Sequence, residues 1–65
     1  MYKLSRQYFE SQYNIAVMDF KMAIDEDAQW KARMEMAKLE KLALEMYGDE
    51  FAIKLNDIAK SQIKL

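Results

Sequence analysis

Residues 45–51 read EMYGDEF, and they hold the only glycine of a 65-residue chain that contains no proline. Glycine readily takes the left-handed conformation that follows a helix end, and an aspartate directly after it can cap a new helix. The stretch therefore predicts one helix that ends near Tyr47 and another that Asp49 caps.

The remaining sequence is rich in Ala, Leu, Met, Lys, Glu and Gln, which lose little side-chain freedom in a helix. We predict an all-α fold of a single domain, with helices over about residues 5–24, 27–47 and 49–63. Ser5 is the expected N-cap of the first helix. Nothing in residues 24–28 forbids one continuous helix across the first two segments, so that alternative stays open.

Ten Lys and Arg residues against eleven Asp and Glu residues give a net charge of −1, which argues against a nucleic-acid partner held through phosphates. The acids gather at residues 25–27 and 49–50, where they favour helix starts. No apolar run is long enough to span a bilayer or to form a signal core. We therefore expect a cytoplasmic protein without a membrane partner.

The chain contains neither Cys nor His, which excludes disulfides, structural zinc and thiolate or imidazole metal ligands. The same absence removes the two residues best suited to acid–base and nucleophilic work near neutral pH, and a chain with one glycine has no glycine-rich phosphate loop. We expect a non-enzymatic protein without a metal or cofactor. Because a chain this short buries only roughly 60% of its unfolded surface, we also expect that it self-associates.

Helical spacing gives the first helix two apolar ridges instead of one. The ridge expected to face the core contains Phe9, Tyr13, Ala16, Val17, Phe20, Ala23 and Ile24. The second ridge contains Leu4, Tyr8, Ile15, Met18 and Met22. This helix is therefore apolar around most of its circumference.

The second helix repeats this arrangement, whereas the third has a single stripe. The main ridge of the second helix contains Ala28, Ala32, Met36, Leu39, Leu42, Ala43 and Met46. Its second ridge contains Trp30, Met34, Ala37 and Leu44. The stripe of the third helix contains Phe51, Leu55, Ile58 and Ala59. An antiparallel hairpin of the two longer helices, with the shorter third helix packed across it, would bury these main stripes.

In such a bundle the second ridges stay at the surface, and contiguous exposed apolar residues mark interfaces. We predict an interface that contains Ile15, Met18, Met22, Trp30, Met34 and Leu44. Trp30 is the expected anchor, since tryptophan combines a large apolar area with one hydrogen-bond donor. In the alternative, the first helix is central and its two ridges belong to one core.

These features predict a small helical regulator or inhibitor that forms a homodimer or small closed oligomer and binds another protein through apolar helix surfaces. Accessory proteins of phages and mobile elements offer an analogy. One alternative is an oligomer that sequesters a nucleotide-like ligand between subunits, with Arg6 and Tyr8 as contacts. Another is a structural or assembly element built from the helical hairpin.

Overall fold

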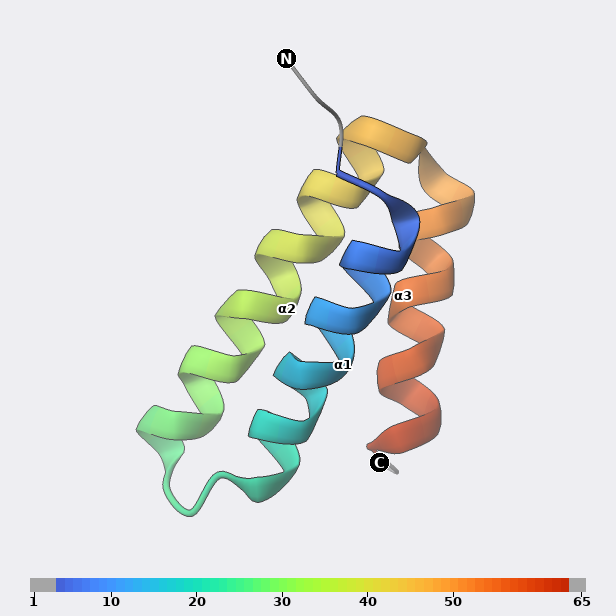
Figure 1. Ribbon diagram of the computed structural model, residues 1–65. Coiled ribbons are helices and arrows are strands. Elements are labelled where there is room, and N and C mark those ends of the chain that lie inside the picture. The colour runs from blue at the N-terminus through green and yellow to red at the C-terminus, as the bar shows by residue number, and fades with distance from the viewer. Residues whose placement is uncertain (1–3, 64–65) are drawn as a thin grey trace.

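The computed structural model of the protein describes residues 4–63, which fold into helices joined by short connections (Figure 1). The helices of this range are α1 (Arg6–Met22), α2 (Glu26–Tyr47) and α3 (Asp49–Gln62). No strand occurs between residues 4 and 63. The predicted all-α fold with three helices is confirmed.

Side chains cap the first two helices. Ser5 Oγ accepts a hydrogen bond from the Tyr8 amide at 3.1 Å, so the predicted cap of α1 is confirmed. Asp25 Oδ1 accepts a hydrogen bond from the Ala28 amide at 2.8 Å. Because Asp25 is the cap, α2 begins at Glu26, one residue before its predicted start.

Residues 23–25 separate α1 from α2, so the alternative of one continuous helix is wrong. The backbone of Ala23 and Asp25 is extended, with ψ angles of 132° and 171°. As a result, α1 ends at Met22 and Ile24 leaves the helical phase that had placed it on the core ridge. The Ile24 side chain is 95% exposed, and its prediction as a core residue is wrong.

Gly48 joins α2 to α3 with φ 92° and ψ −177°. These angles lie in a region that is open essentially to glycine alone, because a Cβ atom would crowd the backbone. Gly48 itself is the residue before α3, and no side chain caps that helix. Asp49 is the first residue of α3, so its prediction as a cap is wrong, although its charge still lies in the favourable first turn.

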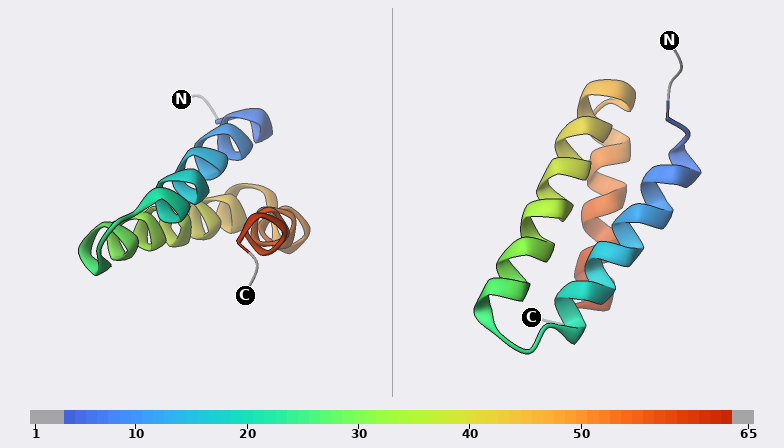
Figure 2. Two further views of the ribbon diagram at one scale, coloured as in Figure 1. Left: turned by 90° about the horizontal axis from the view of Figure 1, so that it is seen from below. Right: turned by 60° about the vertical axis from the view of Figure 1, so that its left-hand side comes forward.

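The first two helices form an antiparallel hairpin, and α3 runs back from Gly48 beside it (Figures 1 and 2). In the left view of Figure 2, α3 is seen nearly end-on while α1 and α2 run across the picture. The third helix is therefore inclined to the hairpin.

The hydrophobic core lies where the three helices meet, and it is formed by Phe9, Tyr13, Val17, Ala43, Phe51, Leu55 and Ala59. Edge-on aromatic contacts strengthen it near Gly48, where the ring centroids of Tyr47 and Phe51 lie 5.3 Å apart. The opposite ridge of α1 stays outside, since Tyr8, Ile15, Met18 and Met22 are exposed. The alternative in which both ridges of α1 form one core is wrong.

On α2 the predicted main ridge is only partly buried. Ala32 and Ala43 lie in the interior, but Leu42 is exposed. Within residues 4–63, none of the helices combines the length and the apolar character that a bilayer crossing requires.

Candidate functional site

A hydrogen-bonded network joins one polar side chain from each helix. The Tyr13 hydroxyl of α1 donates to Glu40 Oε2 of α2 at 2.8 Å. From α3, Asn56 Nδ2 donates to Glu40 Oε1 at 3.4 Å. Both carboxylate oxygens are therefore engaged, and the network ties the three helices together at one point.

Burial of Tyr13 raises the pKa of its phenol well above its usual value. The hydrogen bond to the Glu40 carboxylate and the negative charge of that group act in the same direction. Tyr13 therefore keeps its proton across the neutral range and remains a donor to Glu40. The network is a fixed structural element at physiological pH.

A groove of about 520 Å³ opens beside this network, between α2 and α3, and side chains of α1 also line it. Its apolar lining includes Phe20, Trp30, Met34, Met36, Ala59 and Ile63. Its polar lining includes Tyr13, Arg33, Glu40, Asn56 and Lys60. A mainly apolar depression with a few placed polar groups is typical of a binding site.

The charges of the groove are unbalanced. Arg33 lies on the α2 wall and Lys60 on the α3 wall, and both side chains are exposed. Neither forms a salt bridge within residues 4–63, where the ion pair present joins Lys54 Nζ to Glu10 Oε2 at 3.2 Å. Because Glu40 is engaged by Tyr13 and Asn56, the groove presents two cations without an anionic partner of their own.

Two of the predicted interface residues lie in this groove. Trp30 is 64% exposed, and Met34, one helical turn along, is also exposed. Leu44 is exposed to a similar degree on the same helix, but it lies outside the groove lining. The groove thus contains part of the second ridge of α2.

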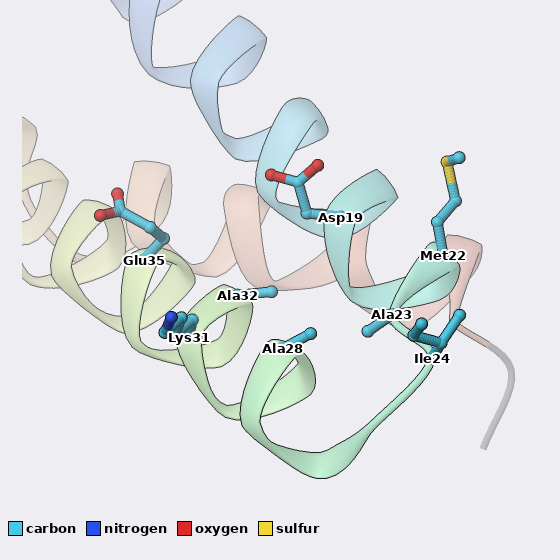
Figure 3. A pocket seen from close by; sticks show the side chains of 8 residues that line it. All are labelled: Asp19, Met22, Ala23, Ile24, Ala28, Lys31, Ala32 and Glu35. Carbon is cyan, nitrogen blue, oxygen red and sulfur yellow. The ribbon is translucent and has the colours of Figure 1, made fainter.

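The other predicted interface residues, Ile15, Met18 and Met22, lie exposed on α1. Met22 lines a separate hollow between the end of α1 and the start of α2 (Figure 3). Lys31 and Glu35 border that hollow from α2, whereas Trp30 and Met34 of α2 line the groove. The structure therefore places Trp30 and Met34 in the groove and Met22 in the hollow, and neither surface contains all six residues.

Arg6 and Tyr8 do not meet within one chain. The Arg6 guanidinium lies over the ring of Tyr47, with its Cζ 4.7 Å from the ring centroid. Tyr8 is half-exposed and makes an edge-on contact with Phe9. Two residues apart on a helix, the two side chains point about 200° apart.

Sequence reasoning missed the cations and the α3 wall of the groove. Asn56 and Lys60 line the groove, although neither belongs to the predicted apolar stripe of α3. A weak signal was present, because Asn56, Lys60 and Ile63 repeat at helical spacing beside the core stripe. Arg33 similarly stands between Trp30 and Met34 in the sequence.

Comparisons with known proteins give no independent indication of this site. Neither the protein-family models, nor the curated proteins, nor the solved structures contain a significant match to the chain.

Proposed function

We propose that this chain is a non-enzymatic regulator that binds another protein by holding one of its amphipathic helices in the groove between α2 and α3. The observation that carries the proposal is an open apolar groove whose walls bear two cations without ion-pair partners in residues 4–63. A helix lying in a groove between two helices is a recurrent mode of recognition.

The dimensions of the groove suit a helix. Its α2 wall runs from Trp30 to Glu40, which is about 15 Å at 1.5 Å per residue. That length matches between two and three helical turns of a partner. Apolar side chains at positions i, i+3 or i+4, and i+7 of such a helix would contact Trp30 and Met34 on one wall and Ile63 on the other.

The charges specify the partner further. A partner helix with Asp or Glu on both flanks of its apolar stripe would place carboxylates beside Arg33 and Lys60. Such complementarity raises association rates and discriminates against cationic partners. Capture of the helix in the groove would cover its apolar face, and this is how an inhibitor withholds a helix from a competing protein.

The proposal includes self-association as a homodimer. Ile15, Met18 and Met22 of α1 are exposed and do not line the groove, and Met22 lines the separate hollow between α1 and α2. A dimer formed at the hollow would leave the groove open to a partner.

A peptide titration tests the groove. The probe is a helical peptide with one leucine stripe flanked by glutamates, and the fluorescence of Trp30, the single tryptophan of the chain, reports its binding. We expect a saturable blue shift with this peptide and at least tenfold weaker binding when lysines replace its glutamates. Equal binding of the two peptides would contradict the role of Arg33 and Lys60.

Two matched variants locate the binding site. Met34→Lys should abolish peptide binding, because it places a charge in the apolar lining of the groove. Leu44→Lys is the control, since Leu44 is on the same helix with similar exposure but outside the groove. Binding that survives Met34→Lys, or that Leu44→Lys weakens equally, would overturn the assignment of the groove.

A further inference from the structure

The hollow between the end of α1 and the start of α2 forms a second site, distinct from the groove (Figure 3). It has a volume of about 500 Å³. Ala23, Ala28 and Ala32 supply small side chains to its lining, and Ala32 is buried. Figure 3 shows these alanines between the two helices, with α3 behind the hairpin. The hollow is therefore apolar in the middle and open to solvent.

A large aliphatic side chain stands at the edge of this hollow. Ile24 lines it and is 95% exposed, and the neighbouring Met22 is also exposed. The three-residue connection between α1 and α2 holds Ile24 outside the core. An apolar protrusion beside an apolar depression of the same molecule is a self-complementary arrangement, because a two-fold axis places each protrusion against the other copy's depression.

Charges of both signs border the hollow. Asp19 and Glu35 are acidic and Lys31 is basic. Within residues 4–63 none of the three forms a salt bridge. A second copy related by a two-fold axis would present its own acids to Lys31 and its own lysine to Asp19 and Glu35. The rim therefore bears the charges of both signs that ion pairs with a second copy would need.

We propose that this hollow is the contact of an isologous homodimer, in which Ile24 of each copy enters the hollow of the other and Lys31 faces the partner's acidic pair. The inference rests on the self-association in the proposed function, and it names the surface. Eight residues line the hollow, against the roughly 20–30 residues per partner of a standard stable interface. We therefore expect a weak dimer in reversible equilibrium with the monomer.

A charge-exchange experiment tests the pairing across the two-fold axis. Lys31→Glu makes the rim wholly acidic, and the double change Asp19→Lys with Glu35→Lys makes it wholly basic. Sedimentation velocity at low salt should show a concentration-dependent dimer for the unaltered chain and monomers for each variant alone. An equimolar mixture of the two variants should dimerise again. Monomers in that mixture, or an unaltered chain that stays monomeric at millimolar concentration, would overturn the proposal.

Matched controls separate the contact from general effects. Lys41→Glu changes the net charge as Lys31→Glu does, on the same helix but outside the hollow, and should leave dimerisation unchanged. Ile24→Ser should weaken the dimer at least tenfold with unchanged circular dichroism. Ile53→Ser, an exposed isoleucine on α3, should not weaken it. Equal effects of the two serine variants would contradict the insertion of Ile24.

The proposals for the groove and for the hollow can be tested independently of each other. Lys31→Glu should bind the glutamate-flanked peptide as the unaltered chain does, because its groove is intact. Met34→Lys should still dimerise. Loss of dimerisation in Met34→Lys would assign the self-contact to the groove and overturn the hollow.

Discussion

Tyr13 and Glu40 are separated by 27 positions in the chain, yet their side chains are joined by a hydrogen bond of 2.8 Å between α1 and α2. The phenol is fully buried, and the carboxylate is half-buried. A hydrogen bond to a charged acceptor contributes about 1.5–3 kcal/mol. Tyr13→Phe should therefore lower the free energy of unfolding by that amount at pH 7, as measured by urea denaturation. An unchanged midpoint would show that the bond contributes no net stability.

The raised pKa of Tyr13 predicts that the protein loses stability at alkaline pH. The fold raises the pKa of Tyr13, so at high pH the folded chain retains a proton that the unfolded chain has lost. The contribution to stability is complete below the unfolded pKa of about 10 and falls by about 1.4 kcal/mol per pH unit above it. Denaturation at a series of pH values above about 10 should show this slope. Because the other tyrosines and lysines also titrate there, Tyr13→Phe is the control, and an identical slope in that variant would contradict the assignment.

Of the three acidic residues at positions 25–27, Asp25 should contribute most to the stability of α2. Its carboxylate caps the Ala28 amide at 2.8 Å. Asp25→Ala should cost about 1 kcal/mol, whereas Asp27→Ala, inside the first turn, removes only a favourable interaction with the helix dipole of about 0.3–1 kcal/mol. The unfolding temperatures of the two variants show which substitution costs more stability. A larger loss for Asp27→Ala would contradict the position of the cap.

The backbone angles of Gly48 predict that asparagine and alanine destabilise the protein to a similar extent at this position. A Cβ atom added there would meet no atom within 4 Å apart from Gly48 itself and its two chain neighbours, so any cost comes from the local backbone conformation. At φ 92° and ψ −177° that cost is about 1–3 kcal/mol for a non-glycine residue. At an ordinary left-handed helix end asparagine is tolerated better than alanine. Here Gly48→Asn and Gly48→Ala should destabilise nearly equally, and a clear advantage of asparagine in thermal unfolding would contradict these angles.

The exposed and buried apolar residues should respond differently to truncation. Trp30→Ser with Met34→Ser should leave helicity and unfolding temperature nearly unchanged, since both side chains are exposed. Phe51→Ala removes a side chain that is 6% exposed and should cost about 3–5 kcal/mol, a large share of the stability of so small a domain. Circular dichroism during heating measures both. Unfolding of the double serine variant would place Trp30 and Met34 in the core.

Local features of the sequence predicted the approximate ranges of the helices, but they left open whether the first two were continuous. The Ser5 cap and the helix break at Gly48 each depend on residues within a few positions. The 3.6-residue periodicity likewise identified Phe9 and Val17 as core residues. Ile24 was assigned wrongly because its environment depends on which residue ends α1, and helix ends are uncertain by one or two residues.

The candidate site was less predictable, because its parts come together only in three dimensions. Trp30 and Met34 could be predicted as exposed apolar residues from the second ridge of α2. Arg33 and Lys60 could not be assigned to one groove, since their placement depends on the angle between α2 and α3, which no periodicity encodes. The contact between Glu40 and Asn56 similarly joins residues whose separation of 16 positions spans the glycine junction.

Gly48 joins α2 to α3 at one end of the pair, and the groove extends toward the opposite end of both helices. The 14 residues of α3 form a lever of about 21 Å, so that a tilt of 10° at the glycine moves the far end by roughly 4 Å. The core contacts of Phe51, Leu55 and Ala59 and the hydrogen bond from Asn56 to Glu40 hold α3 against the other two helices. The spacing of α2 and α3 at the groove thus depends on the backbone angles of one residue, and a change of those angles would also shift Ala59, which belongs both to the core and to the groove lining.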